Sequence, residues 1–208
     1  MRMTGGMTGF GSANLEAVDM QPALELIDIR RCEGLAQAEQ IREMSSYLEN
    51  MDALKYDNWE KLTLDERLEA LQSIENKAAS LSGRDPLQVV AVDLGGPDRQ
   101  GVMTQGQMNW ASRQIEMNVH LLKQDSLTSL RECTDTILHE GRHAYQWSNL
   151  YVRRTEPNDE LYNSWRMNIL ETGYLSCDRF GFQRYSMQPV ELDARVFAAD
   201  TRANLYYR

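Results

Sequence analysis

The sequence predicts an α+β fold, because segments of helical periodicity come first and last and strand-like segments lie between them. The segments are helical at 22–51 and 56–81, strand-like at 87–94, 101–110 and 113–121, and helical again at 127–150, 159–176 and 190–207. Of the 208 residues, 42% are apolar and 25% are charged, an ordinary composition for a chain with one core. We expect residues 1–20 to be a flexible lead-in and residues 21–208 to form a single, mainly helical domain with a small three-stranded sheet.

The two N-terminal helical segments each show one apolar face. Apolar residues recur at helical spacing throughout 22–51 and again in 56–81. Within the second segment, Thr63 and Glu66 have the spacing of a capping box, so the main helix is expected to begin there. Gly83 is expected to end it.

Three short strand-like segments predict the sheet. The first, 87–94, is rich in valine, a residue that favours strands. The segments 101–110 and 113–121 are expected to pair as a hairpin. In the second of them, apolar residues alternate with polar Glu116 and Asn118, which predicts one dry face and one wet face.

The decisive motif is His139-Glu140-Gly141-Arg142-His143, within the helical segment 127–150. Residues four apart lie on one face of a helix, so both imidazoles point into the same volume and can share a metal ion. Glu140 is placed to face a metal-bound water rather than to bind the metal. Two of the three histidines of the chain are in this motif.

This pattern matches the requirements of a catalytic zinc ion. Such an ion takes three protein ligands and leaves the fourth position to water. Zinc lowers the pKa of that water to about 7, and an adjacent carboxylate such as Glu140 can then act as general base. We therefore expect His139 and His143 to bind Zn²⁺ and Glu140 to be catalytic.

A third zinc ligand must come from elsewhere in the chain. His120 lies upstream in a strand-like stretch and is the less favoured choice. The acidic candidates lie downstream of the motif: Glu156, Asp159, Glu160, Glu171, Glu191 and Asp193. Glu171 lies in a helical segment, and Glu191 follows Pro189 at the start of the last predicted helix. The spacing alone leaves Glu191 and Glu171 as competitors.

The motif and the last segment together resemble a known family. A His-Glu-x-x-His run followed by Glu191-x-Asp193-Ala194-x-x-Phe197-Ala198-Ala199 is similar to the gluzincin type of zincin metallopeptidase. The resemblance is to the minimal domains of the ImmA/IrrE kind and to metallopeptidase modules of bacterial toxins and effectors. It covers about residues 134–203. It implies a zincin-like domain with the metal between two helices, Glu191 as third ligand and Asp193 as a supporting or alternative acid.

The resemblance also implies a function. The chain is expected to be a zinc metallopeptidase that hydrolyses peptide bonds, as the effector or toxin domain of a larger secreted protein. Its partners would be a protein or peptide substrate and an inhibitor or immunity protein. By the same resemblance, strand 114–119 would be an edge strand that pairs with an extended substrate, although an ordinary amphipathic edge strand has the same pattern.

Other readings stay open. One is a zinc-stabilised regulatory module that has a peptidase-like fold and no activity, although Glu140 argues against it. Another is hydrolysis of a bond other than a peptide bond. Five tyrosines are candidate oxyanion donors, with Tyr174 and Tyr185 first: Tyr145, Tyr151, Tyr162, Tyr174 and Tyr185.

Composition excludes several classes of function. The net charge of −9 and pI of about 4.9 disfavour binding to a nucleic-acid backbone. There is no apolar run long enough to span a membrane and no classical signal peptide, so we expect a cytoplasmic protein or one exported by another route. The cysteines show no metal-binding spacing and are predicted to be small buried side chains: Cys32, Cys133 and Cys177.

Overall fold

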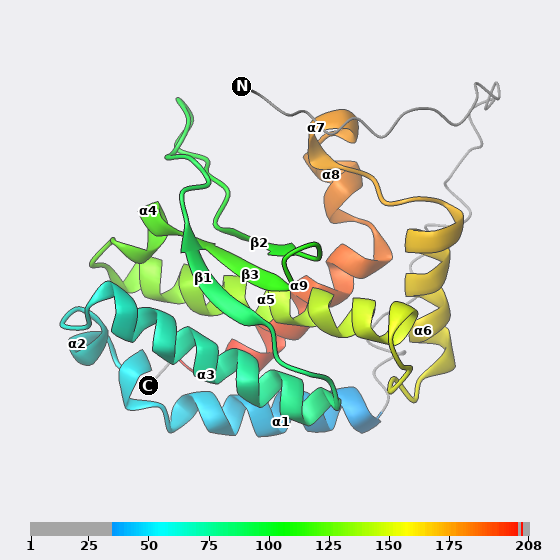
Figure 1. Ribbon diagram of the computed structural model, residues 1–208, viewed down its shortest axis with the longest axis horizontal. Coiled ribbons are helices and arrows are strands. Elements are labelled where there is room, and N and C mark those ends of the chain that lie inside the picture. The colour runs from blue at the N-terminus through cyan, green and yellow to red at the C-terminus, as the bar shows by residue number, and fades with distance from the viewer. Residues whose placement is uncertain (1–34, 204, 206–208) are drawn as a thin grey trace.

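A long central helix, α5 (Leu127–Tyr151), lies against a small sheet in the computed structural model, which describes residues 35–203 and 205. The predicted α+β fold is confirmed (Figure 1). The predicted lead-in, residues 1–20, and the first part of the first helical segment, residues 22–34, lie outside the described residues. The other helices are α1 (Leu35–Glu49), α2 (Tyr56–Trp59), α3 (Leu64–Ser82), α4 (Val119–Leu122), α6 (Asp159–Arg166), α7 (Cys177–Phe180), α8 (Phe182–Ser186) and α9 (Pro189–Arg202), with a 3₁₀ turn at Asp52–Leu54 and a π-helical turn at Met167–Glu171.

The ends of α3 follow the sequence signals. The Thr63 hydroxyl accepts from the backbone N–H of Glu66, and the Glu66 carboxylate accepts from the backbone N–H of Thr63. At the other end Gly83 has a φ of 68°, a left-handed conformation that suits glycine best. Both predicted ends of this helix are therefore confirmed.

The sheet has the order β1-β3-β2, with β1 (Gln88–Val92), β2 (Gly106–Asn109) and β3 (Gln114–Asn118). β3 pairs with β2 in an antiparallel hairpin, as expected, and with β1 in parallel. The prediction that 114–119 is an edge strand is wrong, because both sides of β3 are already paired. The edge strands of the described sheet are β1 and β2, and β2 is the edge strand that packs against α5. A Cβ added at Gly106 would come within 2.6 Å of the Thr136 side chain, so strand and helix are in close contact there.

The predicted wet face of β3 is also wrong, because Glu116 and Asn118 are both buried. The two Glu116 carboxylate oxygens accept hydrogen bonds from the side-chain amides of Gln107 and Asn109 on β2. Asn118 donates to two loop carbonyls. Each of these polar side chains has its hydrogen-bond partners inside the protein. The alternation of apolar and polar residues in this strand therefore did not predict which side chains are exposed.

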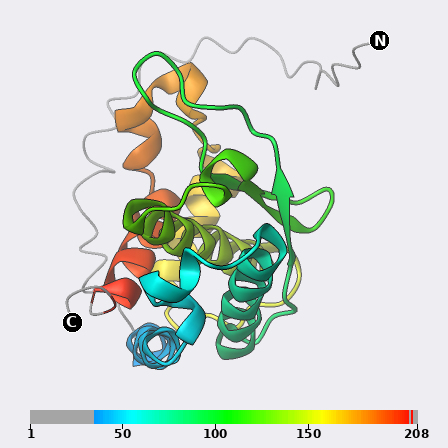
Figure 2. The ribbon, with the colours of Figure 1, turned by 90° about the vertical axis from the view of Figure 1, so that its left-hand side faces the viewer.

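Helix α5 is at the centre of the core. It contacts α9, α3 and both hairpin strands, and Figure 2 shows it between α9 and the sheet. A second, smaller cluster joins α5, α6 and α9 through buried Tyr145, Leu161, Trp165 and Val190. Within the described residues, no helix is long and apolar enough to cross a membrane.

The segment predicted as one helix at 159–176 is shorter than expected. It ends at Glu171, and Gly173 follows with a φ of 83°. Residues 172–188 instead form a projecting loop that contains the short helices α7 and α8 (Figure 1).

The cysteines were predicted to be small buried side chains. The prediction is confirmed for Cys133, whose burial raises the thiol pKa to about 12. It is wrong for Cys177, which is exposed, and Cys32 lies outside the described residues.

A buried ion pair joins the end of α3 to the motif helix. Both guanidinium NH₂ groups of Arg84 donate to the Glu75 carboxylate, at 2.6 and 2.8 Å, and one also donates to the Gly141 carbonyl at 3.1 Å. Glu75 also accepts from the backbone N–H of Leu87, just before β1. The pair thus connects α3, α5 and the start of the sheet.

Replacing Arg84 by methionine should leave a buried, unpaired Glu75 charge and lower the free energy of unfolding by about 3–5 kcal/mol. Urea denaturation of the two proteins measures this difference. Arg42→Met, at an exposed ion pair with Glu39, is the matched control and should change little. Equal losses of unfolding free energy at both positions would contradict a special stabilising role for the buried Glu75–Arg84 pair.

Candidate metal centre

Two helices supply the donor atoms of the candidate site. His139 and His143 lie one turn apart on α5, and α9 crosses α5 so that Glu191 reaches both imidazoles. Pro189 begins α9, where its missing N–H costs no helical hydrogen bond, and Glu191 follows in the first turn, where a negative charge is favourable. Among the described residues, His139, His143 and Glu191 form a group that could hold a metal ion.

The distances within this group fit a metal. The two Nε2 atoms are 3.0 Å apart, His139 Nε2 is 3.4 Å from Glu191 Oε2, and His143 Nε2 is 3.3 Å from Glu191 Oε1. Donors on a tetrahedral zinc ion, with bonds of about 2.0–2.2 Å, lie about 3.3–3.6 Å from one another, so the two His–Glu distances fit such an ion and the two imidazoles are slightly closer. Glu191 is 1% exposed, and its Oε2 has no hydrogen-bond partner within the described part of the chain. A buried carboxylate oxygen without a donor is costly, and a cation would satisfy it.

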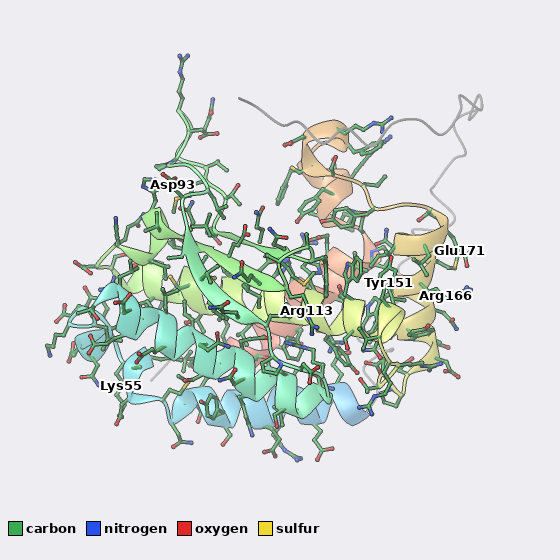
Figure 3. The ribbon with its side chains drawn as sticks, viewed as in Figure 1. Lys55, Asp93, Arg113, Tyr151, Arg166 and Glu171 are labelled. Atoms are coloured by element: carbon green, nitrogen blue, oxygen red, sulfur yellow. The ribbon has the colours of Figure 1, made fainter. Side chains whose placement is uncertain are left out.

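The other acidic candidates lie elsewhere. Glu171 is exposed and forms an ion pair with Arg166 at 2.9 Å; both are labelled in Figure 3. Glu156 is buried and accepts a hydrogen bond from the Tyr145 hydroxyl, so it stabilises the loop after α5. The structure therefore brings Glu191, and not Glu171, to the two histidines.

Three further candidates are also separated from the group. Asp159 and Glu160 lie in the exposed first turn of α6, where Asp159 pairs with Arg154. His120 lies in α4 rather than in a strand, is exposed, and its ring contacts Asp93 at 3.1 Å. Among the described residues, none of these three side chains belongs to the group that could hold a metal ion.

The charges of the site act on one another strongly. Burial lowers the pKa of His143, but the hydrogen bond to Glu191 and the charges of Glu140 and Glu191 outweigh it and raise that pKa to about 9. Burial likewise raises the pKa of Glu191, yet the two histidines and the Tyr174 hydroxyl hold it well below its ordinary value of 4.5. In the metal-free protein, His143 is therefore positively charged at neutral pH and faces the negatively charged Glu191.

The two preferred tyrosines lie beside Glu191. The Tyr174 hydroxyl donates to Glu191 Oε1 at 2.6 Å, and the Tyr174 and Tyr185 rings meet edge to face at 6.1 Å. Burial and the negative charge of Glu191 raise the pKa of both phenols, so both stay neutral donors. Gln188 closes the base of their loop by bonding to the backbone N–H and carbonyl of Leu175.

Behind the three candidate ligands lies a buried polar network that sequence reasoning anticipated only in part. Asp193 is in it, bonded to both the Nε and an NH₂ group of Arg142 at 2.9 and 3.1 Å. Gln146 was missed, although it accepts from His143 Nδ1 at 2.8 Å and donates to Asp193 at 2.7 Å. Its position three residues after His143, on the same helical face, was the available signal.

The remaining neighbours define the surroundings of the site. Glu140 is half-buried on α5, and its charge contributes to the raised pKa of His143. One turn beyond His143, Trp147 stacks between Trp110 and Tyr151, with ring centroids 4.1 and 3.7 Å away. Tyr151 is labelled near the end of α5 in Figure 3. This stack fastens the β2–β3 hairpin to the motif helix.

Comparison with protein-family models, with curated proteins and with solved structures gave no match.

Zinc content should identify the ligands. Purified protein reconstituted with Zn²⁺ should hold about one ion per chain, and His143→Ala or Glu191→Ala should lose it. Glu171→Ala is the matched control and should keep the full content. Retention of zinc by Glu191→Ala would contradict the ligand set.

Metal binding should depend on pH because zinc must displace the proton on His143. With a pKa of about 9, His143 is protonated at neutral pH in the metal-free protein, so binding releases about one proton and affinity rises roughly tenfold per pH unit. Titration calorimetry at pH 6.5–8 in buffers of different ionisation enthalpy measures the proton count. Affinity that falls as pH rises would contradict the raised pKa.

Proposed function

We propose that this protein is a zinc metallopeptidase. The proposal rests on one observation, that three donors of two types, two imidazoles and a carboxylate, gather with ligand-like spacing at a site open to solvent. The side chains of His139 and His143 remain 16% and 14% exposed. Three protein ligands with an open side are typical of catalytic zinc, whereas structural zinc is enclosed by four. The resemblance of the motif to zincins supports the same proposal.

The residues of the site have distinct roles in this reaction. His139, His143 and Glu191 would hold the ion. Bound zinc supplies Lewis acidity, which polarises the substrate carbonyl and makes water nucleophilic near neutral pH. Glu140 takes a proton from the attacking water and passes it to the leaving amine. The neutral hydroxyls of Tyr174 and Tyr185 are the nearest candidates to donate a hydrogen bond to the developing oxyanion.

The substrate that fits this proposal is an extended polypeptide. β2 pairs only with β3 among the described strands, which leaves its other edge, beside α5, able to pair with a peptide. This edge takes the role that the sequence suggested for 114–119. From the resemblance we also propose an effector or toxin role, with an inhibitor or immunity protein as partner.

Glu140→Gln should separate catalysis from metal binding. Loss of the general base should reduce turnover by about 10²–10⁴-fold, while zinc content stays at the wild-type level. The measurement is cleavage of a broad peptide mixture by the zinc-loaded protein, followed by mass spectrometry. Glu132→Gln, also on α5, is the matched control and should remain active.

Two outcomes would count against the peptidase. If the wild-type protein binds zinc but cleaves no peptide, and Glu140→Gln leaves its biological effect intact, the metal-stabilised binding module is the better reading. If Glu140→Gln abolishes a biological effect that involves no peptide cleavage, the bond attacked is of another kind.

A further inference from the structure

We infer that Gln146 is a positioning residue, which fixes the nitrogen that His143 offers to the metal, and that Asp193 fixes Gln146. The inference rests on the proposed metal site and adds residues that the motif does not contain. It is carried by four side chains that are almost completely buried: Gln146, Asp193, Arg142 and Gln37, each at 2% exposed or less.

The first step is the orientation of the Gln146 amide. Its Nε2 donates two hydrogen bonds, one to Asp193 Oδ2 at 2.7 Å and one to the Val190 carbonyl at 2.9 Å. Both of those partners can only accept, because one is a carboxylate and the other a carbonyl. The NH₂ group must therefore point to α9, and the amide oxygen must point to His143.

The second step is the tautomer of His143. The Gln146 oxygen lies 2.8 Å from His143 Nδ1 and can only accept, so Nδ1 must carry a proton. In a neutral imidazole the lone pair is then on Nε2, the atom that faces His139 and Glu191. Within the described residues, Nδ1 of His139 makes no hydrogen bond of this kind. His143 is therefore the histidine whose ring is oriented before a metal binds.

The third step is what holds Asp193. Arg142 donates to both of its carboxylate oxygens, and Gln37 adds a longer bond of 3.4 Å. The guanidinium itself lies 4.9–5.2 Å from three aromatic ring centres, of Tyr145, Trp165 and Phe197. Because aromatic rings surround the guanidinium, Asp193 is its main charged partner and its carboxylate is held in one orientation. Asp193 Oδ2 therefore stays in position to accept the hydrogen bond from Gln146.

The test removes each part of the network with side chains of similar size. Gln146→Met removes the acceptor that faces His143 Nδ1. Arg142→Met with Asp193→Leu replaces the buried ion pair, and with it the acceptor that orients the Gln146 amide, and leaves no charge unpaired. Each of these changes should weaken zinc binding by about 10–100-fold. Because the ion pair acts through Gln146, the triple variant should bind zinc no more weakly than Gln146→Met.

Zinc affinity is measured by competition with a chromophoric chelator, and thermal unfolding of each metal-free variant is measured beside it. Equal zinc affinity in the triple variant and in Gln146→Met supports the inference, because independent structural roles give losses that add. Additive losses, or wild-type affinity after either change, overturn it. In that case, zinc binding by the wild-type protein that is lost in His143→Ala would still support the metal site. If the wild-type protein binds no zinc, both fail.

A second measurement needs no change to the network. Nitrogen NMR of the zinc-loaded protein labelled at histidine reports which ring nitrogen carries the proton, and His120→Ala identifies the signals of the histidine outside the site. His143 should show a proton on Nδ1 that exchanges more slowly than that of His139. A proton on Nε2 of His143 would overturn the inference.

Discussion

The arrangement of the site depends on the buried ion pair between Arg142 on α5 and Asp193 on α9. Removing two charges from water is costly, and the cost is offset only if the geometry is good and the remaining hydrogen bonds are made. Here the pair is bidentate, and the guanidinium is enclosed by aromatic rings. The two helices therefore have one favourable register. In that register, Glu191 lies beside the histidine that follows Arg142 in the chain.

The candidate metal donors and the tyrosines around them lie on different parts of the fold. The three donor side chains are on α5 and α9, two well-packed helices, which suits a site that must keep its geometry. The tyrosines lie on a projecting loop, 172–188, that is closed at its base by Gln188. Loops on a rigid scaffold are where binding groups are commonly found. Tyr174 connects the two parts through its hydrogen bond to Glu191.

Much of the fold followed from local signals. The caps of α3, the valine-rich strand and the hairpin were predicted because each depends on neighbours in sequence. The role of 114–119 was predicted wrongly, because strand order depends on which distant segment pairs with the hairpin. The exposure of Glu116 was predicted wrongly for a related reason: two amides on β2, rather than water, satisfy its carboxylate. Local periodicity cannot distinguish these cases.

From the sequence alone, two imidazoles and a carboxylate could be placed on one helix, because a spacing of four residues puts His139 and His143 on one face. Glu191 could be placed in the first turn of a second helix. The choice between Glu191 and Glu171 needed the three-dimensional structure, because it depends on how α9 crosses α5. The place of Gln146 beside His143 needed it as well, because partners on α9 set the orientation of this amide.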